Sequence, residues 1–571
     1  MEFSSLRKNL KKDFSSFPVV KVAILGDTPT QLLHQALRGY GYEIGVSFDI
    51  FEADYGQIDM QVMDSTSELY EFQPEYVIIF QAAQKLASKF YKKPIDSKIA
   101  YAEISISYVS QLLNVINDNH QCKIICFNFA EINDSVFGNY ANKTDASFLY
   151  QLRKINLGLM DLARETKNLF IADIASLAAY YGENSVFSPT TYTNTGIVFD
   201  IDFWPAIAKS VSDIILAISG KFKKAIVLDL DNTLWGGIIG DDGIENIQIG
   251  ELGIGRAFTE LQYWLKQLKA RGIILAVCSK NYEHIALEPF EKHPDMVLRP
   301  DDIAVFVANW DNKVDNIRHI QSVLNIGFDS MVYLDDNPFE RNMVRNEIPA
   351  LAIPELPEDP AEYLGFLRRL NLFETAAITG EDSERTKQYR EEAKRVTLQK
   401  AYANEDEFLE SLGMKCTVKP FDKFNTPRVA QLSQRSNQFN LRTVRYTEQD
   451  IERIARDDDY TTFTFSLEDK FGDYGLIGVI ILKYRGDTAF IDTWFMSCRV
   501  LKREMENFML NAIVENAKSK GIKQIVGEYI PTPKNELVKD HYKGLGFTEK
   551  DGLWYLSTQK YKPFKNHIKI T

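Results

Sequence analysis

The chain has little cysteine, an excess of negative charge and no long apolar run. Its 571 residues include five cysteines, an odd and scattered set without the paired spacing of a zinc site. Such usage argues against a disulfide framework and predicts a reducing, cytoplasmic location. The formal net charge of −13 argues against broad nucleic-acid binding, because that binding needs a basic surface.

The sequence also contains no segment that is typical of a membrane span. No apolar stretch is long enough to cross a bilayer, so we predict no membrane association. The basic start, residues 1–12, is not followed by an apolar core, so we do not interpret it as a signal peptide. Hydrophobic residues nevertheless make up 45% of the chain and aromatic residues 12%, which is typical of globular proteins. A chain of this length is expected to form about three domains.

The first part of the chain alternates strand-like and helix-like patterns, which predicts a parallel sheet. Gly26-Asp27-Thr28 after the first strand, and Asn128 after a later one, resemble blocks of the SGNH hydrolases, in which a serine replaces Thr28. A hydroxyl nucleophile needs a base, and no histidine lies between His120 and His284. We therefore predict an SGNH-like domain over residues 1–220 that lacks hydrolase activity. A flavodoxin-like docking domain is the alternative.

Two aspartates close an apolar run in the middle of the chain. Residues 224–228 predict a buried strand, and Asp229 and Asp231 follow it. Alternation along a strand would place both carboxylates on one side, at the sheet end where α/β proteins bind ligands. Converging carboxylates need a counter-charge, most simply Mg²⁺. An Asp-rich turn without a metal is the alternative.

Three further polar clusters follow, each at the end of an apolar run or the start of a helix. They contain Ser279 with Asn281, then Lys313, then the pair Asp335 and Asp336. Together with Asp229, Asp231 and Thr233, this order resembles the haloacid dehalogenase (HAD) superfamily.

The HAD resemblance implies a Mg²⁺-dependent phosphoryl-transfer site. Asp229 would be the nucleophile that forms an aspartyl-phosphate, and Asp231 the general acid and base. Mg²⁺ would be held by Asp229, the Asp231 main-chain carbonyl and Asp336, with Asp335 beside them. The substrate phosphate would contact Thr233, Ser279, Asn281 and Lys313. The segment between the first two clusters is too short for a large cap domain, which predicts an open site suited to a bulky partner.

A longer pattern narrows the resemblance. Residues 229–243, 277–281 and 333–341 look like the FkbH family, HAD subfamily IIIC, over essentially the whole chain. This resemblance implies an acyl phosphate substrate such as 1,3-bisphosphoglycerate, release of phosphate, and loading of the acyl (glyceryl) group on an acyl carrier protein. Cys278 is the candidate acyl-carrying thiol, with Lys280 and Lys313 expected to favour its thiolate. A buried inert cysteine is the alternative.

The last third resembles the GNAT acyltransferases. We predict a HAD-like domain over 221–372, a helical linker with mostly solvated charges over 373–414, and the GNAT-like domain over 415–571. The resemblance implies that the loop 497–503 contacts the phosphates of coenzyme A or of a carrier's phosphopantetheine. Its candidates are Arg499, Lys502 and Arg503, although the loop has no glycine for close backbone approach. Tyr542 would serve as an acid, or be a core-edge aromatic. Residues 433–442 predict a recognition loop.

We therefore predict a cytoplasmic α/β enzyme of three domains: an SGNH-like parallel sheet, a HAD core without a large cap, and a GNAT-like α+β domain. Two other functions remain open. The chain could be a small-molecule phosphatase with non-catalytic flanking domains, or a non-catalytic assembly protein.

Overall fold

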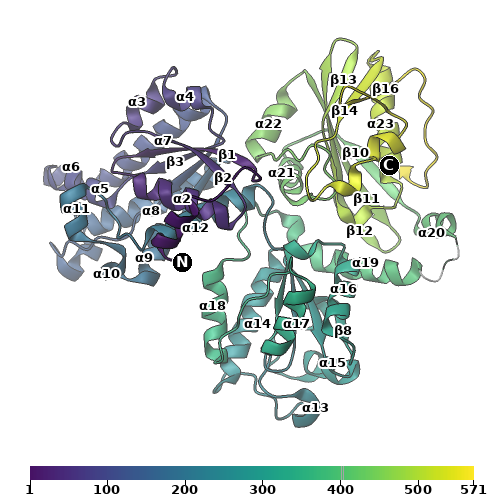
Figure 1. The fold of residues 1–571 in the computed structure, drawn as a ribbon, viewed down its shortest axis with the longest axis horizontal. Helices are drawn as coiled ribbons and strands as arrows, with labels where there is room; N and C mark the ends of the chain where they lie inside the picture. The colour runs from purple at the N-terminus through teal and green to yellow at the C-terminus, as the bar shows by residue number, and fades with distance from the viewer. Residues whose placement is uncertain (400–401, 403) are drawn as a thin grey trace. The chain divides into compact units, whose positions relative to one another are not determined.

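The computed structural model describes residues 1–399, 402 and 404–571, and it divides into two compact units (Figure 1). The first unit is Met1–Leu216 and the second is Ala217–Thr571. The second unit contains both the HAD-like and the GNAT-like sheets. Within the described residues, no helix is both long and apolar enough to cross a membrane.

The first unit is built on a five-stranded parallel sheet in the order β2-β1-β3-β4-β5. Its strands are β1 (Val19–Gly26), β2 (Ser47–Glu52), β3 (Tyr76–Phe80), β4 (Lys123–Phe127) and β5 (Leu169–Ala172). Its helices are α1 (Phe3–Asn9), α2 (Gln31–Glu43), α3 (Ile58–Met63), α4 (Glu68–Phe72), α5 (Ala83–Tyr91), α6 (Ile95–Lys98), α7 (Tyr101–Asn119), α8 (Phe148–Glu165), α9 (Ile174–Tyr181), α10 (Glu183–Val186), α11 (Pro189–Thr195) and α12 (Trp204–Ile218). The predicted parallel sheet is confirmed. The edge strand β2 was not predicted, because Asp49 and Glu52 interrupt its apolar character.

The HAD-like part of the second unit has a four-stranded parallel sheet in the order β8-β7-β6-β9. The strands are β6 (Ala225–Leu228), β7 (Ile274–Ser279), β8 (Ile303–Ala308) and β9 (Met331–Leu334). The helices are α13 (Ile239–Asp242), α14 (Gly255–Ala270), α15 (Glu283–Lys292), α16 (Lys313–Leu324), α17 (Pro338–Glu347) and α18 (Tyr363–Leu370).

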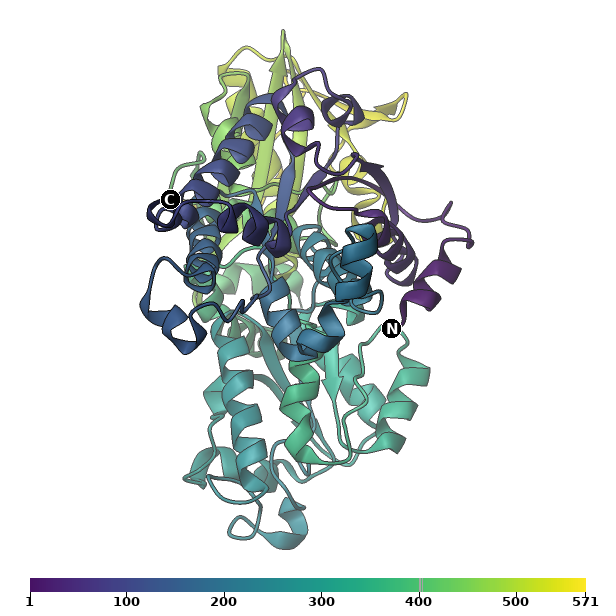
Figure 2. The ribbon, with the colours of Figure 1, turned by 90° about the vertical axis from the view of Figure 1, so that its left-hand side faces the viewer.

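Helices cover both faces of this sheet (Figures 1 and 2). Ile226 and Leu228 of β6 pack with residues of α14, α15 and α18. Ala225 and Val227 face the other way and pack with residues of α16, α17 and α19 (Arg385–Gln399). Because all four strands are buried on both faces, their sequences are continuous apolar runs rather than alternating ones.

The GNAT-like part has an eight-stranded sheet in the order β15-β16-β14-β13-β12-β11-β10-β17, antiparallel except for the β13–β14 and β10–β17 pairs. Helix α23 packs on one face of the sheet, and α21 and α22 pack on the other. The strands are β10 (Lys415–Lys419), β11 (Tyr460–Asp469), β12 (Gly472–Arg485), β13 (Thr488–Met496), β14 (Gln524–Glu528), β15 (Thr548–Lys550), β16 (Leu553–Ser557) and β17 (Lys569–Ile570). The helices are α20 (Glu405–Leu412), α21 (Thr426–Arg435), α22 (Glu448–Arg456), α23 (Met505–Ser519) and α24 (His541–Gly544).

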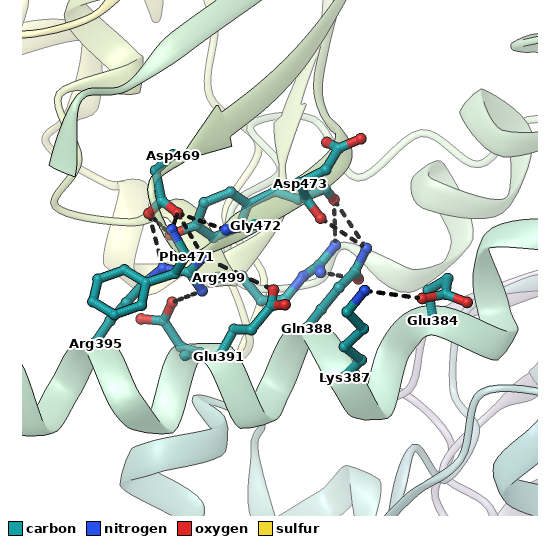
Figure 3. Close-up of polar contacts among 12 residues, drawn as sticks. Glu384, Lys387, Gln388, Glu391, Arg395, Asp469, Phe471, Gly472, Asp473 and Arg499 are labelled. Atoms are coloured by element: carbon teal, nitrogen blue, oxygen red, sulfur yellow. Dashed lines mark hydrogen bonds and ion pairs between the residues drawn. The ribbon is translucent and has the colours of Figure 1, made fainter. Parts of the chain in front are cut away.

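Helix α19 joins the two sheets, and its charges are not mostly solvated as predicted. Arg395 is 1% exposed and donates two hydrogen bonds of 2.8 Å to the carboxylate of Asp469. Figure 3 shows these side chains of α19 pointing at the β11–β12 hairpin, where Asp469 also accepts from the backbone of Phe471 and Gly472. The prediction was wrong because the charges of a helix are buried when a second domain supplies their partners.

Candidate active site

The carboxyl ends of β6 and β9 bring Asp229 and Asp335 together around Lys313. These strands pair in parallel, so the residues that follow them lie at the same sheet edge. The Lys313 Nζ lies 3.0 Å from Asp229 Oδ1 and 2.6 Å from Asp335 Oδ2, and all three side chains are buried. Lys313 is the first residue of α16, where the side chain of Asn312 caps the Val314 N–H at 2.8 Å. The positive helix end and the ammonium group together make this edge suited to an anion.

The protonation equilibria of the site reflect this crowding. Burial raises the pKa of Asp229 to about 7, with Lys313 opposing the rise and Asp335 adding to it. Burial acts against the charge of Lys313, but Asp229 and Asp335 outweigh it and raise the Lys313 pKa. Burial and the charge of Asp335 also raise the pKa of Asp336. Three carboxylates therefore share one lysine. The negative charge that Lys313 leaves uncompensated favours the binding of a further cation.

The donor set fits Mg²⁺. Carboxylate oxygens of Asp229, Asp335 and Asp336 lie within 4.8 Å of one another, and hard oxygen ligands are those that Mg²⁺ prefers. Both carboxylate oxygens of Asp335 already accept hydrogen bonds. One accepts from the Asn337 N–H at 2.8 Å, and the other accepts from Lys313 and the Tyr333 hydroxyl. Asp229 and Asp336 are therefore the side chains best placed to hold the ion.

The side chain of Asp231 is held in a separate set of hydrogen bonds. Its Oδ1 accepts from Trp235 Nε1 at 2.9 Å and from the Ile239 N–H at 3.0 Å. Its Oδ2 accepts from Asn281 Nδ2 at 2.9 Å. The structure thus fixes the carboxylate in one orientation and keeps it outside the group formed by the other three aspartates in the described residues. This arrangement suits a group that handles protons.

Two of the predicted phosphate contacts lie beside Asp231. Ser279 ends β7, and its Oγ is 3.4 Å from Asn281 Nδ2. Thr233 is placed differently, since it is fully buried and its Oγ1 accepts from the Asp336 N–H at 3.2 Å. This hydrogen bond connects the segment that follows β6, which contains Asp229 and Asp231, to the segment that follows β9, which contains Asp335 and Asp336.

Two residues that the sequence analysis did not select complete the site. Tyr333 lies two positions before Asp335 on β9, so alternation places its hydroxyl on the same side of the sheet. Arg341 on α17 donates to the main-chain oxygens of Asp335 and Asp336, at 2.8 and 2.7 Å. Spacing could have revealed Tyr333. Arg341 lies within the FkbH-like stretch 333–341, but its role depends on where α17 begins.

Comparison with known proteins identifies the family. The family model of the FkbH N-terminal domain matches residues 21–216. The solved N-terminal part of the protein BF1531 from Bacteroides fragilis, containing a phosphatase domain complexed with Mg, is 52% identical. The match covers 66% of this chain and 100% of that chain, with a TM-score of 0.64. The chain belongs to the FkbH family.

Matches to other proteins add little to this FkbH assignment. Ribosomal-protein-S18-alanine N-acetyltransferase from Escherichia coli is 15% identical over 26% of this chain and 96% of that chain, with a TM-score of 0.21. Spermidine N-acetyltransferase from Vibrio cholerae, solved with CoA and spermine, is 14% identical over 26% of this chain and 98% of that chain, with the same score of 0.21. Values this low carry no functional argument. No curated protein sequence matches the chain.

In this FkbH-family chain, Cys278 is not the activated thiol that the sequence analysis expected. It is fully buried among the apolar residues between the sheet and α16, and its Sγ lies 3.8 Å from the Lys313 carbonyl oxygen. Burial raises the pKa of the thiol to about 12, and the ammonium of Lys313 only partly offsets this. Lys280 is paired with Glu340 at 2.6 Å. The expectation failed because the thiol is buried, and the raising effect of burial on its pKa exceeds the lowering effect of Lys313.

Exposed aromatic side chains lie close in sequence to the site residues. Tyr282 follows Asn281, and Trp310 lies three positions before Lys313. They are 58% and 63% exposed, and their rings meet edge to face at 5.8 Å. Large aromatic groups left in water next to a catalytic edge are typical of a surface that binds a partner.

The basic loop after β13 does not present its arginines for phosphate binding. Arg499 donates to Gln388 of α19 and to the Tyr474 carbonyl oxygen at 3.2 Å. Arg503 pairs with Glu392 of α19 at 2.9 Å. Both are buried, and only Lys502 is exposed among the three candidates. The prediction that Arg499 and Arg503 contact CoA phosphates is contradicted by these bonds, which attach the loop to the linker helix instead.

The predicted recognition loop closes the space between β13 and β14. These strands pair in register only over Thr488–Phe490, and the chain near Leu441 bonds to both beyond that point. The Leu441 N–H donates to Trp494 O at 3.1 Å, and its carbonyl accepts from the Ile530 N–H at 2.9 Å. Arg442 adds bonds of 2.6 Å to Asp492 O and 2.8 Å to Glu528. The chain itself therefore bridges β13 and the segment after β14 where the two strands no longer pair.

Tyr542 belongs to the core rather than to a reaction site. It is fully buried on α24, stacks on Trp554 at 6.2 Å, and packs so tightly on Gly527 that a Cβ there would lie 2.3 Å from its ring. Burial raises its pKa well above the ordinary value. The alternative of a packed aromatic is the one that the structure favours.

In the first unit, Thr28 is fully buried, while Asn128 donates to Asp173 at 2.7 Å. Asp27 accepts from the Ala82 N–H at 2.9 Å, and burial raises its pKa to about 6. The SGNH resemblance and the absence of hydrolase activity stay predictions. A hydroxyl without solvent access is consistent with an inert domain.

Proposed function

We propose that this chain is a Mg²⁺-dependent phosphatase of the HAD type that also loads an acyl group on a carrier-protein thiol. Its substrate would be an acyl phosphate such as 1,3-bisphosphoglycerate. The observation that carries the proposal is the buried cluster of Asp229, Lys313 and Asp335 with Asp336 beside it. The FkbH-family relative, whose phosphatase domain was solved with Mg, supports the choice of reaction and ion.

The positive charges of the site would allow the Asp229 carboxylate to attack a negatively charged phosphoryl group. A carboxylate that approaches a phosphoryl group is repelled by the negative oxygens, and Lys313 lies where it offsets that repulsion. Mg²⁺ bound by Asp229 and Asp336 would supply the remaining positive charge. Asp229 Oδ would attack the phosphorus atom of the phosphate ester, and the bond from phosphorus to the substrate oxygen would break.

Asp231 would deliver the proton that this step needs. Its orientation is fixed by Trp235 and Asn281, so the carboxyl group stays beside the leaving oxygen without having to rotate. It would then accept a proton from the water that hydrolyses the aspartyl-phosphate. General acid–base help of this kind is worth on the order of 10²–10⁴ in rate.

Acyl transfer is the second half of the proposal. The thiolate of a carrier's phosphopantetheine would attack the carbonyl carbon of the acyl phosphate, the carbon–oxygen bond to phosphate would break, and inorganic phosphate would leave. Burial of Cys278 favours a thiol brought by the partner over one supplied by this chain. Tyr282 and Trp310 offer an exposed aromatic surface on which such a partner could dock.

One experiment tests both halves. The protein is incubated with 1,3-bisphosphoglycerate, Mg²⁺ and candidate carrier proteins; phosphate is measured, and the carrier is weighed by mass spectrometry. Asp229→Asn should fold but release no phosphate from the ester, while Asp315→Asn, an exposed change on α16, should behave as the wild type.

The outcomes separate the rival functions. Phosphate release without any mass added to a carrier would favour a small-molecule phosphatase. No release from any acyl phosphate would favour a non-catalytic assembly protein. Full turnover by a folded Asp229→Asn variant would remove Asp229 as the nucleophile.

A further inference from the structure

The first unit contains a cavity at the carboxyl edge of its parallel sheet. Its volume is about 440 Å³, and residues of α5, α7 and α8 line it together with the segments that follow β3 and β4. Gln81 is the first residue after β3, and Phe129 lies two positions after β4. The order β2-β1-β3-β4-β5 changes direction between β1 and β3. Open α/β sheets bind ligands outside the carboxyl ends of their strands, near such a point.

The wall of this cavity is mostly apolar. Leu86 of α5, Val109 of α7 and Ile155 of α8 line it with buried side chains. Tyr101 and Phe129 add aromatic surface and are also buried. The Tyr101 hydroxyl already donates to the Leu86 carbonyl oxygen at 2.9 Å. Because such a wall gains free energy by contact with apolar groups, it favours a hydrocarbon over a sugar.

Three lysines add positive charge to this apolar wall. Lys89 lies in the last turn of α5, and Lys92 and Lys93 follow that helix. Lys89 and Lys92 are exposed, so their ammonium groups lie at the mouth of the cavity. The Lys93 Nζ lies over the Tyr101 ring, 5.9 Å from its centre. The residues that line the cavity in the described part of the chain include no aspartate or glutamate.

Two carboxylates lie close to the cavity without lining it. Asp27 accepts from the Ala82 N–H at 2.9 Å, and Asp59 accepts from the Tyr108 hydroxyl at 2.8 Å. Asp27 also feels the charge of Lys89. Within the described residues, however, neither Lys89 nor Lys92 takes part in a hydrogen bond or an ion pair through its side chain. Both ammonium groups are therefore available to an anion.

We propose that this cavity binds an organic anion with an apolar body, such as a medium-chain carboxylate. The hydrocarbon would lie against Leu86, Val109 and Phe129, and the carboxylate would meet Lys89 and Lys92 at the mouth. Lysine is a compact point charge that suits a carboxylate, and the described lining has no arginine to hold a phosphate with paired hydrogen bonds. The volume falls within the range of small-molecule sites, about 300–1,000 Å³.

The site lies wholly in the first unit, whereas the aspartate edge belongs to the second. The proposal therefore does not rest on the phosphatase reaction. The test measures binding and not phosphate release, so failure of the proposed reaction and failure of this site are distinguishable.

The test is calorimetric titration of the full chain in EDTA, which removes metal ions that could bind a carboxylate. Octanoate is the probe. 1-Octanol carries the same chain without the charge, and acetate carries the charge without the chain. We expect octanoate to bind saturably, at one molecule per chain, and about tenfold or more tighter than either control. Added KCl should weaken octanoate binding, because salt screens the attraction to the lysines.

A double variant tests the lysines. Lys89→Gln combined with Lys92→Gln should weaken octanoate binding about tenfold and leave 1-octanol binding unchanged. Lys8→Gln combined with Lys11→Gln makes the same pair of changes at exposed positions near the N-terminus and should have no effect.

A second pair of variants tests the charge at the cavity in another way. Ile104 lines the cavity in the first turn of α7 and is 51% exposed, so a polar side chain is tolerated there. Ile104→Asp should repel octanoate, whereas Ile104→Asn, of similar size but neutral, should keep most of the affinity. Circular dichroism confirms folding, and this pair decides the matter if the double lysine variant unfolds.

Three results would overturn the proposal. One is the absence of saturable octanoate binding. Another is unchanged affinity in the folded double lysine variant, or equal affinity in Ile104→Asp and Ile104→Asn. The third is equal affinity for octanoate and 1-octanol, which would leave an apolar cavity without a subsite for the anion.

Discussion

Arg341 holds the backbone of the acidic pair Asp335 and Asp336, and its substitution tests how far Mg²⁺ binding depends on that backbone. It donates to the main-chain oxygens of Asp335 and Asp336 and is itself 5% exposed. Arg341→Met should loosen this loop and weaken Mg²⁺ binding about 10–100-fold, the usual effect of losing an outer contact of a metal site. The measurement is the Mg²⁺ dependence of phosphate release. Arg345→Met, on the same helix but more exposed, is the matched control.

Asn281 is bonded to Asp231, the carboxylate that we propose as the general acid and base. Its amide donates to Asp231 Oδ2 at 2.9 Å, and that bond helps to orient the acid. Asn281→Ala should lower kcat by about 10–100-fold, within the limit set by general acid–base catalysis, and leave Mg²⁺ binding unchanged. Steady-state kinetics and a Mg²⁺ titration separate the two effects. A variant with normal kcat would show that Trp235 and Ile239 alone orient Asp231.

Some of these residues could be found from the sequence and others could not. Lys313 and Asp335 were predicted from the resemblance to the HAD superfamily, together with their places at a helix start and a strand end, which converge at one edge of a parallel sheet. Whether Cys278 is activated was left open, since the sequence does not show how completely the thiol is buried, and burial is what raises its pKa. Arg499 and Arg503 were placed wrongly because their partners, Gln388 and Glu392, are more than a hundred residues away.

At the scale of elements, α19 is held to the GNAT-like sheet by a buried ion pair. Arg395 and Asp469 are 1% and 0% exposed at their side chains and share two hydrogen bonds (Figure 3). Arg395→Met leaves Asp469 buried without this partner, and we expect the second unit to lose about 3–5 kcal/mol of unfolding free energy. Urea denaturation followed by tryptophan fluorescence measures the change.

The control for that experiment lies on the same helix. Arg390 pairs with Asp301, but the side chains are 36% and 85% exposed. Arg390→Met should therefore cost at most about 1 kcal/mol, as solvent-exposed ion pairs do. Equal losses in the two variants would mean that helix propensity, and not the buried pair, determines the stability of α19.

Element boundaries in the GNAT-like part were largely predictable, but the role of the segment near Leu441 was not. Strands β11 to β14 are rich in β-branched and aromatic residues, a composition that is typical of strands. The loop 433–442 is rich in polar side chains, which favoured recognition. In the structure the Leu441 backbone and the Arg442 side chain bond to distant parts of the same chain, and the residue types alone do not show these partners.

For the molecule as a whole, Mg²⁺ should stabilise the second unit. Asp229, Asp335 and Asp336 repel one another when only Lys313 compensates them, and an ion that binds the folded form alone adds to stability. At about one hundred times its Kd, such an ion contributes about 2.7 kcal/mol. Differential scanning calorimetry in Mg²⁺ and in EDTA at matched ionic strength should show the higher melting temperature with Mg²⁺, and Asp336→Asn should reduce the difference.

The rise in melting temperature caused by Mg²⁺ should also depend on pH. Because burial raises the pKa of Asp229 to about 7, the carboxyl group is protonated below that pH and Mg²⁺ must displace the proton. The gain in melting temperature should therefore shrink as the pH falls through about 7 and be full above it. A gain that is constant across this range would contradict the combination of a raised Asp229 pKa and Mg²⁺ binding by that carboxylate.

The segment that ties β13 to β14 also has a practical consequence for chemical biology. Ligands that need an open gap between the ends of β13 and β14 would meet the backbone around Leu441 and the side chain of Arg442. Dianionic fragments directed at the aspartate edge offer a better starting library, since Lys313 and the N-terminus of α16 favour an anion there.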